Sequence, residues 1–185
     1  KFKRDLHPFD AYGKLREPIL RLTGWARAFG ANSPSDAWAI GNTTDPATRL
    51  GQSPLRSPSV FNFFRPGYVP PNSGIGTAAL VAPEFQITNE SSVVGYVNFM
   101  QTVVSAGRGD TKADYSALLP LADDAAALVA EIDVLLAAGQ LADTTRKTIA
   151  DAVGTITIGT DAKRLSRINA ALVLVLAAPE FLVLK

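Results

Sequence analysis

The sequence predicts an all-α fold, a bundle of about five helices with a long proline-rich irregular segment. Three observations support this prediction. Apolar residues recur at helical spacing in five stretches of the 185-residue chain. Seven of its 12 prolines fall between residues 31 and 80, where neither a long helix nor a central strand tolerates them. The closing helix is apolar on every side after Ala170, which is typical of a helix in the middle of a bundle.

The first predicted helix follows a polar entry and begins at Pro18, because proline suits the first helical turn. Gly30 supplies the expected stop at its carboxyl end. Its apolar residues form one stripe with two flanking positions: Ile19, Leu22, Ala26 and Phe29, with Leu20 and Trp25 widening the face.

The segment from residue 31 to residue 80 is predicted to be irregular, apart from a turn of helix at "SPSVFNFF" (57–64). It is too rich in large apolar residues to be a disordered linker. Long irregular segments in compact domains are uncommon, and they are usually functional or packed on another surface. We therefore interpret residues 1–185 as a single helical domain that contains this unusual segment.

Four more helices are predicted after residue 88, each with a polar cap at its start. The caps are Thr88 or Asn89, Asp123 or Asp124, Asp143, and Thr160. Their expected buried stripes are Val93, Val97, Met100 and Val104, then Leu128, Ile132 and Leu135, then Ile149, Val153 and Ile156, and finally Leu165, Ile168, Leu172 and Val175. Gly107 and Gly139 end the first two, and the last, 161–178, is expected to be the most buried element.

The tetrapeptide "APEF" occurs twice, at 82–85 and 178–181. Proline suits the first turn of a helix, and glutamate in that turn meets the positive end of the helix dipole. We interpret both copies as helix boundaries, with the second ending the closing helix. The alternative is that Glu84 and Glu180 form an acid–base pair of the kind found in glycosidases, but no sequence feature brings them together.

Composition excludes several classes of function. The formal charge of +1 gives no general attraction to nucleic acid. The absence of cysteine excludes disulfides, thiolate catalysis and cysteine-ligated metal sites. The longest apolar run, 170–184, is interrupted by Pro179 and Glu180 and is too short to span a membrane. The chain starts at Lys1 without a methionine or a signal peptide, so we interpret it as a portion of a longer protein.

No residue carries a recognisable catalytic, cofactor or metal signature. His7 is the only histidine and has no second ligand for a metal beside it. "NTTD" (42–45) and "DTKAD" (110–114) contain possible calcium ligands, but they lack the glycine and terminal glutamate of an EF-hand. Ordinary turns closed by Asn and Asp side chains are therefore preferred there.

One set of residues remains as a possible interaction surface in the loop 58–68 and beside it: Arg56, Phe61, Phe63, Phe64, Arg65 and Tyr68. Exposed aromatic rings beside arginines can stack on sugar rings or bind a protein groove. The simpler expectation is that the loop is ordered over the helices with Phe61 and Phe64 buried and Arg65 facing water or a carboxylate. Part of its outer face is expected to stay apolar, where another part of the parent protein would dock.

Four segments together resemble the C-terminal part of a bacterial family, domain of unknown function 1800. They are "GKLREPILRLTGWARAFGA", "LGQSPLRSPSVFNFFRPGYVPP", "LVAPEFQITNESSVVGYVNFM" and "ALVLVLAAPEFLVLK". The resemblance implies a longer parent protein with a preceding N-terminal part. It also implies export to the periplasm or the extracellular space, and it supplies no catalytic residues.

Three functions follow as hypotheses. The leading one is a non-enzymatic structural or protein-interaction portion of an exported bacterial protein, with the preceding N-terminal part or another exported protein as its partner. The second is a carbohydrate- or polymer-binding module that uses the aromatic loop 58–68. The third is a hydrolase completed by residues outside this chain. No cofactor, nucleic acid or membrane span is expected.

Overall fold

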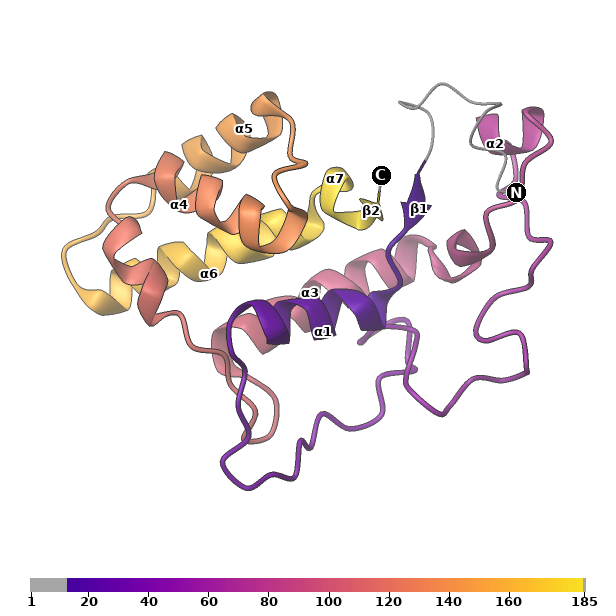
Figure 1. Cartoon of the computed structure of the whole chain (residues 1–185), viewed down its shortest axis with the longest axis horizontal. Coiled ribbons are helices and arrows are strands. Elements are labelled where there is room, and N and C mark those ends of the chain that lie inside the picture. Colours follow the sequence, from indigo (N-terminus) through magenta and orange to yellow (C-terminus); the bar gives the residue numbers. More distant parts are fainter. Residues whose placement is uncertain (1–12, 185) are drawn as a thin grey trace.

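The computed structural model describes residues 13–184, and the predicted all-α fold is confirmed (Figure 1). The helices are α1 (Pro18–Ala28), α2 (Gly74–Thr77), α3 (Glu90–Ala106), α4 (Ala125–Ile132), α5 (Asp143–Gly154), α6 (Asp161–Ala177) and α7 (Pro179–Leu182). Two 3-10 helices span Pro83–Ile87 and Ser116–Leu121, and a π-helical turn spans Asp133–Ala137. Every helix within 13–184 falls short of the length and apolarity that crossing a membrane requires.

The strands β1 (Lys14–Leu15) and β2 (Val183–Leu184) are short and form the two-stranded sheet of the described chain. They pair in antiparallel register, Lys14 with Leu184 and Leu15 with Val183. Beside them, the Arg16 guanidinium lies 4.3 Å from the centre of the Phe181 ring. This pairing joins the entry to α1 with the segment that follows α7 (Figure 1).

Helix α1 begins at Pro18 and is followed by Gly30, whose φ of +52° is the left-handed conformation that suits a helix end. Leu22 and Trp25 are buried along it, and Phe29 is buried at its end. The expectation that Leu20 joins this face is wrong, because Leu20 is 46% exposed. Residues two positions apart in a helix lie on nearly opposite sides of it, so the side chains of Leu20 and Leu22 point in different directions.

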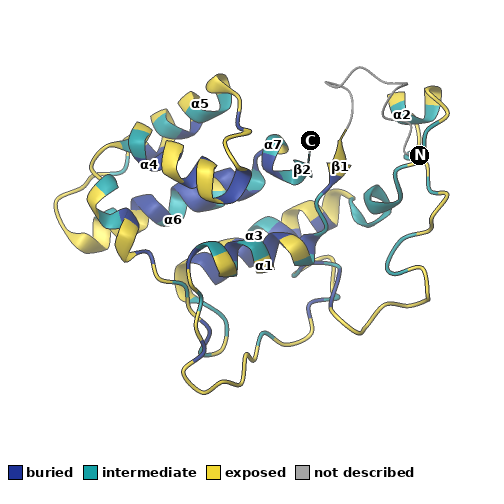
Figure 2. Ribbon diagram, in the orientation of Figure 1, coloured by how far each residue is buried: buried dark blue, intermediate teal, exposed yellow. Residues whose placement is uncertain are grey.

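Helix α6 occupies the centre of the bundle, where it packs against α3, α4 and α5. Ile168, Leu172 and Val175 are fully buried, as the sequence predicts. Leu165 is 39% exposed and so leaves the expected stripe, and Leu174 is equally exposed. Figure 2 shows buried residues concentrated along α6 and on the sides of its neighbours that face it. The helix is central, but it keeps one narrow solvent-facing edge.

Helix α3 starts at the predicted cap Asn89, whose side chain accepts from the Ser92 amide while Ser92 Oγ accepts from the Asn89 amide. Its buried face runs through Gly95, Tyr96 and Phe99, whereas Val93 is 47% exposed. The predicted stripe holds at Met100 and Val104, which are buried, and is wrong at Val93. At Gly95 the backbone of Pro46 and Ala47 lies directly on the helix.

Helix α4 begins at Asp124, whose carboxylate accepts from the amides of Ala126 and Ala127. The π-helical turn that follows moves the buried position by one residue, so Leu136 is buried and Leu135 is 41% exposed. The sequence places Leu135 inside, and that prediction is wrong. In α5, Asp143 is the first helical residue rather than the cap and pairs with Arg146.

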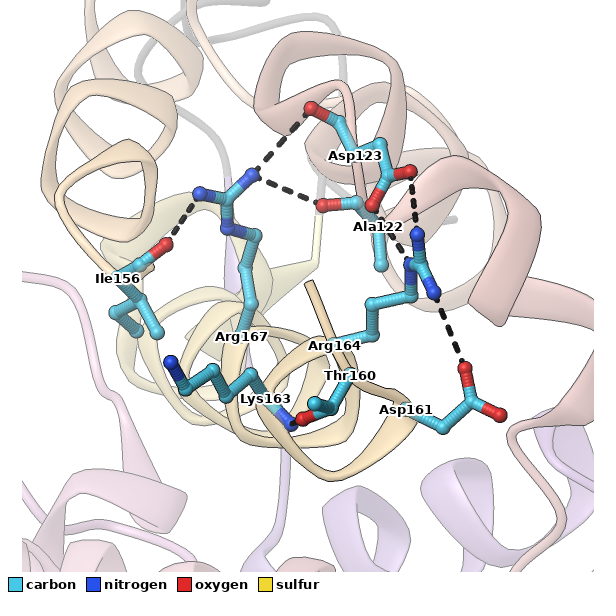
Figure 3. Close-up of polar contacts among 8 residues, drawn as sticks. All are labelled: Ala122, Asp123, Ile156, Thr160, Asp161, Lys163, Arg164 and Arg167. Atoms are coloured by element: carbon cyan, nitrogen blue, oxygen red, sulfur yellow. Dashed lines mark hydrogen bonds and ion pairs between the residues drawn. The ribbon is translucent and has the colours of Figure 1, made fainter. Parts of the chain in front are cut away.

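Two arginines of α6 join it to the start of α4 and the end of α5 (Figure 3). The buried Arg167 donates to the carbonyl oxygens of Ala122 (3.0 Å), Gly154 (3.2 Å) and Ile156. The neighbouring Arg164 binds the Asp123 carboxylate through two hydrogen bonds of 2.7 and 2.8 Å. A buried guanidinium whose two terminal nitrogens donate to helix-end carbonyls fixes how these three helices meet.

Both APEF copies lie at helix boundaries, as the sequence predicts. Pro83 opens a 3-10 helix that ends at Ile87, so the first copy does not run directly into α3. Glu84, in its first turn, pairs with Lys14 at 3.1 Å. Pro179 ends α6 and starts α7, and Glu180 accepts from Thr145 Oγ1 at 2.6 Å beside the start of α5. The two carboxylates bind different partners.

Candidate functional site

The segment 31–80 contains α2, capped by Ser73, and is otherwise made of turns and extended backbone. The turn of helix predicted for 57–64 is wrong. A tight turn closed by an isolated bridge between Ser59 and Asn62 occupies that place, and Asn62 has a φ of +67°. Ser59 Oγ accepts from the Phe61 amide, which stabilises the turn in place of a helix.

Three polar side chains attach this segment to the start of α1. The buried Gln52 accepts from the Ile19 amide at 3.2 Å and so satisfies a free donor of the first helical turn. Its amide nitrogen donates to the Glu17 carboxylate, and Asn62 Nδ2 donates to the same oxygen at 3.3 Å. Glu17 thereby holds both ends of the stretch 52–62.

The far side of the loop is held by hydrogen bonds of its backbone with the region that precedes α3. The Arg65 amide donates to Gln86 Oε1 at 2.6 Å, and the Ala82 amide donates to the Tyr68 carbonyl at 2.9 Å. The stretch from Gln52 to Tyr68 is therefore attached to the helical body at both ends.

The aromatic residues of this loop are less buried than the sequence predicts. Phe61 is 57% exposed, so the expectation that it packs inside is wrong. Phe63, Phe64 and Tyr68 are half-buried. The two arginines of the possible interaction surface, Arg56 and Arg65, are exposed, and neither forms an ion pair with a residue of 13–184.

Several aliphatic side chains of the same segment also face solvent. Leu55 is fully exposed, Val60 is 94% exposed and Val69 is 41% exposed. Leu55 also has a φ of +59°, which is uncommon for a branched residue and is retained only where surrounding contacts hold it. We call Leu55, Val60, Phe61 and Val69 the apolar loop surface.

A shallow pocket of about 220 Å³ lies between this loop and the start of α1. Leu55 and Phe63 give it apolar walls, while Glu17, Gln52 and Asn62 give it polar ones. The Glu17 carboxylate already accepts from both amide side chains, so its position suits fixing the loop rather than attacking a substrate.

Sequence reasoning identified the aromatic residues of this site but missed Glu17, Gln52 and Asn62. Gln52 and Asn62 do lie in the segment "GQSPLRSPSVFNFF", which carries the family resemblance. Their pairing with Glu17 joins positions 35 and 45 residues apart, and no spacing rule indicates it.

The remaining sequence candidates are local turns except at Asp110, where the expected turn is wrong because the carboxylate binds the remote residues Ser33 and Ser35. Asn42 accepts from the Thr44 amide, Asp45 from the Ala47 amide and Asp114 from the Ser116 amide, as expected for turns closed by Asn and Asp. His7 lies outside the described residues. Within 13–184, no group of three or more histidine, aspartate or glutamate side chains is placed to hold a metal ion.

A second loop, 33–40, is held by the carboxylate of Asp110. Asp110 accepts from the Ser35 amide and from Ser33 Oγ, each at 2.8 Å. Hydrogen bonds from Ser35, followed by the one from Ser33, lower the pKa of Asp110 to about 2. Ser33 Oγ also accepts from the Trp38 amide, so the carboxylate fixes the backbone of a half-exposed tryptophan.

This arrangement predicts an acid-sensitive loop. A carboxylate whose pKa is lower when folded stabilises the fold above its unfolded pKa of about 4. That contribution is lost as the pH falls from about 4 through about 2. Tryptophan emission, followed across this range below the unfolding temperature, should report a change in the surroundings of Trp38. Asp110→Asn should remove this step, and an identical titration in the variant would contradict the assignment.

A family model described as "Protein of unknown function (DUF1800)" matches residues 3–183. No match was found among curated proteins or among solved structures.

Proposed function

The chain belongs to the DUF1800 family, and on that premise we propose that it is a non-enzymatic, protein-interacting portion of an exported bacterial protein. The observation that carries the proposal is the apolar loop surface. The loop is attached to Glu17 by the Gln52 side chain and to Gln86 by the Arg65 amide. Leu55, Val60 and Phe61 nevertheless face solvent. Several exposed apolar side chains on one attached loop are typical of a surface that is covered in the assembled protein.

The shape and charge of this surface favour a protein partner. Exposed aromatic and aliphatic side chains can supply the apolar centre of an interface, and arginine is enriched in such interfaces. Arg56 and Arg65 lie in the same segment without ion pairs to described residues. We therefore propose an apolar partner surface with carboxylates at its rim. The proposed partner is the preceding part of the parent protein that the resemblance implies.

A second candidate is binding of a carbohydrate or another polymer. The exposure of Phe61 and the pocket beside Phe63 favour it, because sugars stack on aromatic faces and bond to amide side chains such as Gln52 and Asn62. Only Phe61 offers a mostly open ring, however, and the two amides are already bonded to Glu17. We therefore rank this candidate second.

The test compares the isolated chain with the preceding part of the parent protein, expressed separately. Calorimetric titration should show binding, and the double variant Leu55→Ala/Phe61→Ala should weaken it at least tenfold, as truncation of central interface residues does. Because both side chains are exposed, the variant should keep its free energy of unfolding within about 0.5 kcal/mol of that of the unaltered chain.

The control is Leu135→Ala, which truncates an equally apolar exposed side chain on the π-helical turn and should leave binding unchanged. Unaltered binding by the double variant would contradict the proposed docking surface. Binding of a soluble polysaccharide that Phe61→Ala abolishes would favour the second candidate.

A further inference from the structure

A pocket of about 310 Å³ lies between α3 and the stretch 47–49. Arg49 lines it from that stretch and Arg108 from the turn after α3, while the buried Phe99 and Val103 form its apolar wall. Both arginines are half-buried, and no aspartate or glutamate of the described chain lines the pocket. The pocket therefore brings two positive charges together without a negative one. None of these residues belongs to the apolar loop surface.

Each of the two arginines is held through one nitrogen. Arg49 Nη1 donates to the Asn42 carbonyl oxygen at 2.7 Å, and Arg108 Nε donates to the Ile40 carbonyl oxygen at 3.3 Å. Neither guanidinium forms an ion pair with a residue of 13–184. Their other nitrogens are open to solvent, because neither side chain contains a buried atom without a partner. These nitrogens can donate to a molecule in the pocket.

The carboxylates nearest to these arginines in sequence are already bound elsewhere. Asp45 accepts from Thr48 Oγ1 at 2.6 Å and from the Ala47 amide at 2.9 Å. These hydrogen bonds, followed by the charge of Arg49, lower the pKa of Asp45, which is therefore ionised at neutral pH. Asp110 holds the loop 33–40 through two hydrogen bonds. The pocket thus retains an uncompensated positive charge at its surface.

We propose that this pocket binds a phosphate group, as the free ion or at the end of a small organic molecule. A phosphate monoester carries nearly two negative charges at neutral pH and can neutralise both arginines, whereas a carboxylate can neutralise one. Guanidinium groups match phosphate oxygens through paired hydrogen bonds. Asn98 lines the same pocket and offers a further amide donor. The volume falls at the lower end of the range of small-molecule sites.

The test follows backbone and side-chain amides of the isotope-labelled chain by NMR at constant ionic strength. The probes are phenyl phosphate, inorganic phosphate and benzoate, which separate the double charge from the aromatic ring. We expect the signals of Asn98 and Arg49 to shift saturably with phenyl phosphate, at a dissociation constant of about 1 mM. Benzoate should bind about tenfold more weakly, since it carries a single charge.

Inorganic phosphate distinguishes the two sources of the group. It should bind several-fold more weakly than phenyl phosphate, because it has no apolar part to lie against Phe99 and Val103. Equal affinities would assign the site to the free ion, and the phosphate site itself would stand.

Two variants and a matched control test the contacts. Arg108→Gln should weaken phenyl phosphate at least tenfold, and Asn98→Ala, which truncates an exposed side chain, should weaken it several-fold. Arg56→Gln removes the same charge outside the pocket and should leave the affinity within about twofold. The proposal is overturned if the shifts do not saturate, if benzoate binds as tightly as phenyl phosphate, or if neither variant binds more weakly than Arg56→Gln.

Discussion

Replacing Gly95 with alanine is expected to destabilise the chain by about 2–3 kcal/mol, as overpacking does. A β-carbon at this position would lie 2.3 Å from the Pro46 carbonyl oxygen and 2.7 Å from the Ala47 carbonyl carbon. Both contacts are with backbone, which cannot rotate away as a flexible side chain would. The loop around Pro46 must therefore move off α3, or the helix must shift.

The matched control is Gly24→Ala in α1, where an added β-carbon meets nothing within 4 Å. There the substitution should stabilise the protein by about 0.5–1 kcal/mol, because alanine favours a helix interior more than glycine does. Urea unfolding of both variants measures the pair. Effects of the same sign would show that the loop does not rest on α3 as described.

Truncating Leu172 to alanine is expected to cost about 2–5 kcal/mol, the usual range for a core leucine. Leu172 is fully buried in α6, which packs against three other helices. The substitution would leave a cavity between these helices, and their packing prevents the cavity walls from closing it. The control is Leu174→Ala on the same helix, where the side chain is 39% exposed and the loss should stay below about 1 kcal/mol. A loss below about 0.5 kcal/mol for Leu172→Ala would contradict the central position of α6.

The sequence predicts those features that depend on local chemistry. The caps at Asn89, Asp124 and Thr160 and the proline starts at Pro18 and Pro179 all appear where the pattern indicates them. Each needs only the residue itself and a few neighbours along the chain. The same is true of the turns closed by Asn and Asp.

Predictions fail where another part of the chain decides the outcome. Gly95 belongs to the buried face of α3, and a glycine contributes nothing to an apolar stripe, so the pattern favoured Val93. Leu135 and Leu136 exchange roles because the helix widens into a π turn, which shifts the register by one residue.

The candidate site shows the same limit. The aromatic loop was identified as unusual from its composition, but the prediction that Phe61 is buried assumed that apolar residues hold the loop in place. Polar residues hold it instead: Gln52 and Asn62 bind Glu17, which lies far away in sequence. The aromatic ring is thereby left free to face solvent.

The pairing of β1 with β2 has a mechanical consequence. Lys14 and Leu184 form the outer pair, and Leu15 and Val183 form the inner one, so both strands leave the body on the same side. A force that separates the chain at these two points opens the antiparallel pairs one after another, as in a zipper, rather than shearing them together. The first event in a single-molecule pulling experiment should therefore occur at low force, before the packing around α6 bears load.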